Sequence, residues 1–295
     1  MVDRSVAERL SSNSAFALEL EGVGRQFGAL VALADINLRV QSGERRAILG
    51  SNGAGKTTLF NAVTGDFPPT TGRIRFFSED VTAFPVYERI RRGLRRTYQI
   101  SQLFAGLTVI DSIFVACRGV SRGRLSLVRP SARDATMAQA HSIASSVYLD
   151  DILETPVATL SHGQQRQLEI ALSLTGAPRF ILFDEPAAGL SPAERRDLVA
   201  ILNALPSHIG YIIIEHDLDV ALRVSTYVTM MHNGRIFKEG APSEIENDEE
   251  VQAIYLGAGH GSDPFLSAAE GEGGSASSGP ASLLWRVARA PGRLA

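Results

Sequence analysis

The chain has 295 residues, of which 44% are apolar and 21% charged, an ordinary composition for a globular protein. This length accommodates one α/β domain with an inserted subdomain. The formal net charge of −3 excludes a bulk attraction to nucleic acid, and the single cysteine, Cys117, excludes an intrachain disulfide and fits a reducing compartment.

Targeting signals and basic patches are the next features of the composition. The first ten residues contain Asp3 and Glu8 and lack the apolar core of a signal peptide. No stretch approaches the roughly 18 to 20 apolar residues needed to span a bilayer, so we expect a cytosolic chain unless a partner holds it at a membrane. The one basic cluster is interpreted as a solvated helix face in preference to a partner-binding patch, because runs of charge usually face water; it comprises Arg89, Arg91, Arg92, Arg95 and Arg96.

The first part of the chain predicts an antiparallel sheet and then a strand, a loop and a helix. Residues 16–20 and 36–40 alternate apolar and polar side chains, as half-buried antiparallel strands do. Residues 44–49 are expected to run as a strand into a glycine-rich loop, with a helix at 57–63 after it. A strand at 72–77 and a helix at 86–92 follow.

From about residue 102 to residue 178 the pattern is mainly helical and predicts an inserted helical subdomain. Two short, fully apolar strands come next, at 180–183 and 211–214, and a helix separates them. Apolar runs that alternate with helices indicate a parallel sheet covered on both faces. The remaining predicted elements are helices at 108–117, 135–147, 163–174 and 192–204, and a hairpin of strands 227–231 and 235–238 that turns at Asn233-Gly234.

The glycine-rich loop over residues 50–57 fits the pattern G-x-x-x-x-G-K-[ST], between a predicted strand and a predicted helix. Its glycines allow successive backbone N–H groups to point at a β-phosphate. Lys56 reaches the β and γ oxygens, and Thr57 ligates Mg²⁺. The residues expected to contact a nucleotide here are Gly50, Ser51, Asn52, Gly53, Ala54, Gly55, Lys56, Thr57 and Thr58.

Polar residues end the two apolar strands, where ligands of parallel sheets gather. Asp184 is expected beside the phosphate loop as the second Mg²⁺ ligand, and Glu185 is the candidate general base for an attacking water, a role worth about 10²- to 10⁴-fold in rate. The alternative is a solvated carboxylate pair at a strand end. His216 ends the next strand, where it is placed to contact a γ-phosphate; the alternative is a structural histidine. Asp217 is interpreted as an N-cap.

The run Leu160-Ser161-His162-Gly163-Gln164-Gln165 opens a predicted helix. Its Ser and Gly suggest a second anion cradle, built from backbone N–H groups and the positive end of the helix. The same run satisfies the capping box S-x-x-Q through Ser161 and Gln164, a local interpretation that is compatible with the first. Ser191 and Glu194 form another capping box, for which the structural interpretation is sufficient.

Together these motifs resemble the nucleotide-binding subunits of ATP-binding cassette (ABC) transporters over roughly residues 16–257. The resemblance lies in the order of the landmarks: the phosphate loop, Gln99 after an Arg-Thr-Tyr strand, the Leu-Ser-x-Gly-Gln signature, the Asp-Glu pair, the Gly189-Leu190-Ser191-Pro192 loop and His216.

The fold that this resemblance implies is an α/β P-loop NTPase core with a parallel sheet, an N-terminal antiparallel β part and an inserted helical subdomain. It divides the chain into an extension (1–13), an ATP-binding domain (14–257, helical subdomain about 102–178) and a tail (258–295). A shift to Gly, Ser, Ala and Glu predicts that the tail is disordered.

The activity that the resemblance implies is Mg²⁺-dependent ATP hydrolysis, with Lys56, Glu185 and His216 as the catalytic residues. Two such domains would face each other head to tail, and each ATP would lie between one phosphate loop and the other signature. Ser161, Gly163 and Gln164 would then serve the neighbour's nucleotide. Gln99 would sense Mg²⁺ and contact the permease. Phe27 would stack on adenine, the alternative being a core aromatic. Two departures from the family pattern are His162, where glycine is usual, and Ser191, where aspartate is usual.

Finer similarity is to the subfamily that serves branched-chain amino acids, amides and urea. It implies permease subunits, a second ATPase subunit that is identical or paralogous, and indirectly a periplasmic solute-binding protein, with no nucleic acid. The location implied is the cytoplasmic face of the inner membrane, through the permease. The alternatives are a transporter for another substrate class, an ATP-binding regulator without turnover, or a soluble ABC ATPase acting on DNA or the ribosome; one cassette without a sustained heptad run disfavours the last. The cues are residues 102–104, 107–110, 162–170, 185–190 and 255–257.

Overall fold

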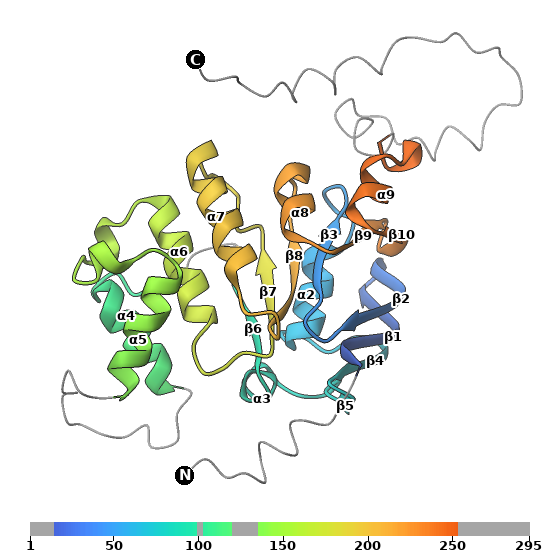
Figure 1. Cartoon of the computed structure of the whole chain (residues 1–295). Helices are drawn as coiled ribbons and strands as arrows, with labels where there is room; N and C mark the ends of the chain where they lie inside the picture. Colours follow the sequence, from blue (N-terminus) through green and yellow to red (C-terminus); the bar gives the residue numbers. More distant parts are fainter. Residues whose placement is uncertain (1–14, 99–102, 120–134, 253–295) are drawn as a thin grey trace, which may run out of the picture. The chain divides into compact units, whose positions relative to one another are not determined.

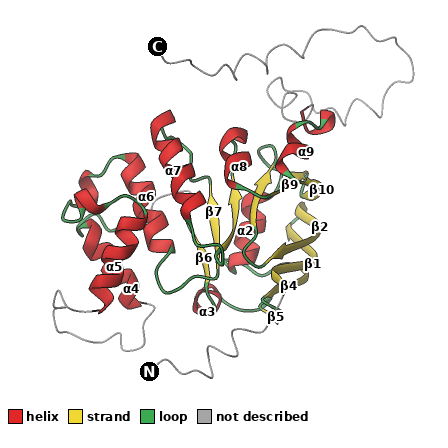
Figure 2. Ribbon diagram, viewed as in Figure 1, coloured by secondary structure: helices red, strands yellow, loops and turns green. Residues whose placement is uncertain are grey.

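The computed structural model describes residues 15–98, 103–119 and 135–252. The strands of this part form two sheets, and helices pack against them (Figures 1 and 2). The predicted N-terminal extension and the predicted disordered tail lie outside the described residues.

The first sheet is antiparallel and has four strands. Its first two strands are much longer than the predicted segments. The sequence pattern detected only part of each strand, because register shifts interrupt their pairing, for example between Leu20 and Val23 and between Arg25 and Gln26. Each bulge resets which side chains face inward, so strict alternation covers only one segment of each strand. In spatial order the strands are β2 (Leu30–Gln41), β1 (Phe16–Phe27), β4 (Thr71–Phe76) and β5 (Glu79–Asp80).

The second sheet has six strands and is parallel except for one edge strand. Strand β10 pairs antiparallel with β9, and Asn233 and Gly234 turn between them with φ of 46° and 72°, as the Asn-Gly pair predicts. In spatial order the strands are β10 (Arg235–Gly240), β9 (Tyr227–His232), β3 (Arg45–Leu49), β8 (Gly210–Ile214), β7 (Phe180–Asp184) and β6 (Leu94–Arg96).

Helices cover both faces of the six-stranded sheet, which explains the fully apolar strands. Helix α2 (Lys56–Thr64) lies between the two sheets and shares one buried cluster with residues of both. Helices α7 (Pro192–Ala204) and α8 (Leu218–Val224) lie on the opposite face (Figure 1), where the Tyr211 hydroxyl donates to the carbonyl of Val224. Every residue of β7 and β8 is therefore buried.

Beyond β6 lies a group of packed helices, within a residue or two of the predicted bounds: α4 (Val109–Gly119), α5 (Ala135–Ser146) and α6 (His162–Ser173). They lie side by side in Figure 1. Short helices complete the described chain: α3 (Val86–Arg91), α9 (Pro242–Glu246) and the 3₁₀ turns η1 (Asp150–Ile152) and η2 (Val157–Thr159). None of the helices in the described ranges has both the length and the apolar character to cross a membrane.

The arginine cluster is not a solvated helix face, so that interpretation of the sequence is wrong. Arg89 is 1% exposed, and its guanidinium donates to the carbonyl oxygens of Ala62 and Val63 at the end of α2. The last carbonyls of a helix lack intrahelical partners and attract a cation, which accounts for this burial. Burial lowers the pKa of Arg89 to about 10, so it stays charged at neutral pH. Arg95 is also buried, whereas Arg91 is exposed as expected.

Candidate functional site

The phosphate loop opens into a cavity of about 440 Å³ at the carboxyl ends of the parallel strands. Residues 52–58 of the loop line it together with Glu185 and His216, so the structure brings together most of the predicted phosphate and catalytic residues. The remaining walls are residues 30–32 of β2 and the Asn233-Gly234 turn.

Glycine is required in this loop by close packing and by backbone conformation. A Cβ on Gly50 would lie 2.2 Å from the carbonyl oxygen of Met231, and Gly55, with φ of 97°, would direct one to 2.7 Å from the carbonyl oxygen of Ala32. Gly55 is the N-cap of α2, where no side chain provides a capping hydrogen bond. The helix therefore begins without side-chain partners for its first N–H groups, an arrangement that suits an anion.

Lys56 lies folded over its own loop. Its Nζ donates to the carbonyl oxygens of Gly50 at 2.6 Å and Ser51 at 3.0 Å, and the residue is 6% exposed. Burial lowers the pKa of this amine, and the nearby charges of Glu185 and Asp184 act against that shift. The ammonium is held inside the loop by acceptors that phosphate oxygens would replace.

Asp184 is buried at the end of β7, with 1% of its surface exposed. Its Oδ2 accepts from Arg96 at 2.7 Å, whereas Oδ1 is buried without a hydrogen-bond partner in the described part of the chain. Burial raises the pKa of this carboxyl, and the hydrogen bond and charge of Arg96 oppose the increase. A buried, unpartnered carboxylate oxygen beside Lys56 fits a cation.

Two oxygens of the described residues are of the kind that Mg²⁺ takes. No three His, Cys, Asp or Glu side chains of the described residues gather as a metal cage. Mg²⁺ characteristically takes one or two protein oxygens and completes its octahedron with phosphates and water. Thr57, which is exposed in the first turn of α2 and lines the cavity, and Asp184 Oδ1 are oxygens of this kind.

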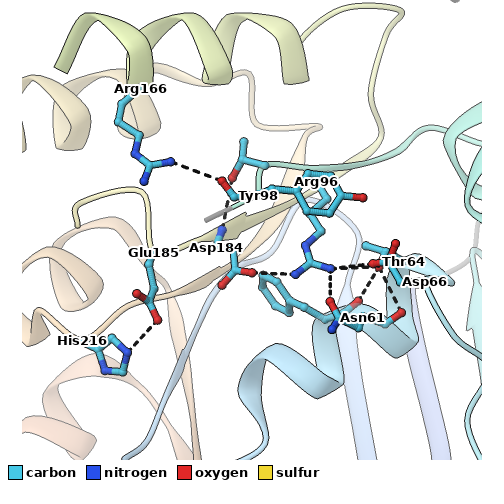
Figure 3. A network of polar contacts seen from close by, with 11 residues as sticks. Asn61, Thr64, Asp66, Arg96, Tyr98, Arg166, Asp184, Glu185 and His216 are labelled. Carbon is cyan, nitrogen blue, oxygen red and sulfur yellow. Dashed lines mark hydrogen bonds and ion pairs between the residues drawn. The ribbon is translucent and has the colours of Figure 1, made fainter. Parts of the chain in front are cut away.

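Glu185 and His216 form a hydrogen-bonded pair on the cavity wall, with 2.8 Å between Oε1 and Nε2 (Figure 3). Because a carboxylate only accepts, this bond requires the proton on Nε2. Glu185 has φ of 49°, an uncommon conformation for this residue, and its N–H donates to the carbonyl of Ile214 on the neighbouring strand. This conformation is strained for a residue other than glycine, and the carboxylate reaches His216, which follows the neighbouring strand β8.

Glu215 is a buried carboxyl that the sequence motifs did not identify. One oxygen accepts from the N–H of Ala187 at 2.7 Å and the other from the N–H of His216 at 3.3 Å. Burial raises its pKa to about 7, although the two N–H donors oppose the shift. It fixes the loop after Glu185 to the loop after β8. Its position directly behind an apolar strand, like that of Asp184, was a signal in the sequence.

The start of α6 lies away from the phosphate-loop cavity. Ser161, Gly163 and Gln164 line a separate space of about 170 Å³ against α7, which shares no residue with the first cavity. The capping box between Ser161 and Gln164 is formed as predicted. The N–H of Gly163 donates to Oε1 of Glu194 at 3.2 Å. Glu194 therefore completes the capping box of α7 with one carboxylate oxygen and accepts the N–H of the signature glycine, Gly163, with the other.

His162 is exposed but does not point freely into solvent. An ideal Cβ on Gly189 would lie 3.0 Å from its Cε1 atom, so the ring covers the α-carbon of Gly189. The residue that departs from the family pattern thus contacts the loop that follows Glu185.

Two further predicted site residues remain predictions. Gln99 lies outside the described residues. Phe27 is 42% exposed, which excludes the core-aromatic alternative, and its ring packs edge-on against Phe67 with Arg25 4.5 Å from its centroid. Leu30 and Val31, and not Phe27, line the cavity.

Known proteins resemble the chain over most of its length. Residues 33–188 match the family model described as ABC transporter. The high-affinity branched-chain amino acid transport ATP-binding protein BraF of Pseudomonas aeruginosa is 35% identical over 249 residues, which are 81% of this chain and 97% of BraF. The corresponding LivG of Escherichia coli is 34% identical over 248 residues, 81% of this chain and 97% of LivG.

A solved structure agrees with these relatives. The crystal structure of an ATP-binding cassette of an ABC transporter in its ADP conformation superposes with a TM-score of 0.72 at 29% identity, covering 82% of this chain and 99% of that one. Its fold contains the same α/β core, as the sequence motifs predict. The chain therefore belongs to the ABC transporter family and is an ATPase subunit of the ATP-binding cassette type.

Proposed function

We propose that the chain energises a membrane importer, with branched-chain amino acids, amides or urea as the transported class. The observation that carries the catalytic part is the single cavity shared by the phosphate loop and the Glu185–His216 pair. The transported class is supported by the relatives BraF and LivG, whose names specify branched-chain amino acid transport.

Phosphate binding uses the loop from Gly50 to Thr58. The N–H groups at the start of α2, which have no side-chain cap, donate to the phosphate oxygens, and Lys56 Nζ exchanges its two carbonyl partners for β and γ oxygens. Phe27 does not line the cavity, but it is 42% exposed, and we keep it as the residue that stacks on the adenine. This part of the site binds one nucleotide within one chain.

Hydrolysis uses Glu185 as the general base. It takes a proton from water as the water oxygen attacks the γ-phosphorus and the bond from that phosphorus to the β–γ bridging oxygen breaks. His216 hydrogen-bonds the carboxylate at 2.8 Å and follows the end of β8, where it would contact the γ-phosphate of a bound nucleotide. When bound, Mg²⁺ neutralises charge on the β and γ oxygens; Thr57, Asp184 and Gln99 are the residues that would hold it.

Association with a second ATPase subunit completes the site. Ser161, Gly163 and Gln164 serve the neighbour's nucleotide, which agrees with their separation from the phosphate-loop cavity of their own chain. The subunits are identical or paralogous, bind permease subunits at the cytoplasmic face of the inner membrane, and act with a periplasmic solute-binding protein. The domain division at residues 13 and 257, with a helical subdomain at about 102–178, belongs to the same proposal.

The test is to purify the tagged full chain with its permease from native cells and to measure ATP hydrolysis and solute uptake in proteoliposomes. We expect leucine, an amide or urea, with the binding protein, to stimulate both activities. Glu185→Gln should lower hydrolysis by about 10²- to 10⁴-fold while ATP binding persists. Hydrolysis unchanged by Glu185→Gln refutes the catalytic assignment, and stimulation only by an unrelated solute refutes the transported class.

A further inference from the structure

Arg96 at the end of β6 joins the carboxylate strand to the phosphate-loop helix. Its side chain is 6% exposed. One guanidinium nitrogen, Nη2, donates to Asp184 Oδ2 at 2.7 Å. The other, Nη1, donates to Asn61 Oδ1 at 2.5 Å, Asp66 Oδ2 at 2.9 Å and Thr64 Oγ1 at 3.3 Å (Figure 3). We call these residues the Arg96 network.

On the Asp184 side, the network leaves the carboxylate one fixed orientation. Arg96 engages Oδ2, and Oδ1 remains buried without a partner in the described part of the chain. The backbone N–H of Asp184 donates to Thr97 Oγ1 at 3.3 Å, one residue after Arg96. Rotation of the carboxylate would break the Arg96 hydrogen bond to Oδ2, so this bond also fixes the direction of Oδ1.

On the α2 side, the same guanidinium holds the C-terminal half of the helix that starts with Lys56 and Thr57. Asn61 and Thr64 belong to α2, and Asp66 follows it and accepts from the Thr64 hydroxyl at 2.6 Å. A nine-residue α-helix is a stiff rod of about 13 Å, so a contact at its second turn constrains the position of its first. Arg96 therefore constrains Asp184 and Thr57 together.

We propose that Arg96 is a positioning residue for the Mg²⁺ site: it fixes the Asp184 carboxylate relative to the helix that carries Thr57. The inference rests on the proposed function, which assigns Mg²⁺ to Asp184 and Thr57. A planar guanidinium with donors on two edges spans both partners, which a lysine ammonium cannot do with the same geometry. Residues that orient metal ligands typically change metal affinity 10- to 100-fold when mutated.

The test separates geometry from charge. Arg96→Lys keeps the positive charge and removes the two-sided contact, so a higher Mg²⁺ requirement in this variant reflects positioning. Binding of a fluorescent ATP analogue to the full chain is titrated with MgCl₂ and repeated in EDTA. We expect the half-saturating Mg²⁺ concentration to rise about tenfold in Arg96→Lys, whereas the affinity in EDTA should change less than this, because no residue of the phosphate loop is replaced.

Three further variants complete the design. Arg92→Lys is the matched control, since Arg92 pairs with Glu79 and Glu88 outside the network. Asp184→Asn is the positive control for the metal site. Asp66→Asn weakens only the α2 side and is expected to raise the Mg²⁺ requirement about threefold, which keeps the proposal testable if Arg96→Lys does not fold.

The outcomes distinguish the two levels of inference. Wild-type Mg²⁺ dependence in folded Arg96→Lys, or in Asp66→Asn where Arg96→Lys does not fold, overturns the positioning role. If Asp184→Asn also leaves the dependence unchanged, the Mg²⁺ assignment itself is wrong. Lower thermal stability with an unchanged Mg²⁺ requirement identifies a purely structural arginine and overturns the proposal.

Discussion

The starts of helices α2 and α6 differ in what satisfies their N–H groups. The N-cap of α2 is Gly55, which provides no side-chain hydrogen bond, and the helix opens into the 440 Å³ cavity. At α6, Ser161 forms a complete capping box and the Glu194 carboxylate accepts from Gly163. The start of α2 has no side-chain cap and suits an anionic ligand, whereas the Gly163 N–H at the start of α6 donates to a carboxylate of its own chain. Under the proposed function, a phosphate of the neighbour's nucleotide would compete with Glu194 for the Gly163 N–H.

The largest effect is expected at the start of α2. Lys56→Ala removes the ammonium that would replace its two carbonyl contacts with phosphate contacts. Hydrogen bonds to charged groups contribute about 1.5–3 kcal/mol each, so two of them predict at least 100-fold weaker ATP binding to the single chain. Lys238→Ala is the matched control, because Lys238 is the other lysine of the sequence and pairs with Asp248. Calorimetric titration with ATP measures the affinity of both variants. Equal affinities would contradict the role of Lys56 in phosphate binding.

A different phenotype is expected at the start of α6. Ser161→Ala should leave ATP binding to the single chain unchanged and lower hydrolysis in the assembled transporter by roughly 10²-fold, the typical effect of removing one donor to a developing charge. The control is Ser191→Ala, which removes the corresponding cap of α7. Each substitution should cost about 1 kcal/mol of helix stability. Equal losses of ATPase activity in Ser161→Ala and Ser191→Ala would show that Ser161 acts only as a helix cap.

We expect the stability of the chain to depend on the protonation of Glu215, which accepts a hydrogen bond from the loop after Glu185. The Glu215 carboxyl has a pKa raised from 4.5 to about 7, so between these values the folded chain binds more protons than the unfolded chain. The free energy of unfolding must therefore fall as the pH rises from about 4.5 to 7, by up to roughly 3 kcal/mol from this group. Glu215→Gln should remove that part of the slope, which urea unfolding at pH 5 and pH 7.5 measures. If the free energy of unfolding changes equally with pH in the wild type and in Glu215→Gln, the pKa of Glu215 is not raised.

Sequence patterns predicted the motifs and the meeting of the phosphate loop with Glu185 and His216 at the strand ends, but missed particular long-range contacts. The phosphate loop, the Ser161 cap and the Asn233-Gly234 turn each depend on residues within a few positions. The burial of Arg96 depends on Asp184, 88 positions away along the chain. The local run of arginines does not contain this partner, so the run by itself indicated a solvated helix face. The contact from Gly163 to Glu194 spans 31 positions and adds a role to a residue that its capping box already explained.

The smallest expected effect concerns the ring that connects the two regions. His162 covers Gly189, where φ is 75° and an added Cβ would lie 3.0 Å from the ring. His162→Gly should change ATP hydrolysis of the assembled transporter by no more than about threefold, because His162 lines neither of the two cavities. Gly189→Ala should destabilise the wild-type chain more than the His162→Gly chain, with a coupling of about 0.5–1 kcal/mol in urea unfolding. The destabilisation that Gly189→Ala still causes in the His162→Gly chain measures the cost of the positive φ alone. A tenfold faster hydrolysis in His162→Gly would instead identify the ring as a brake on the signature helix, since its removal would free the start of α6 from the loop that follows Glu185.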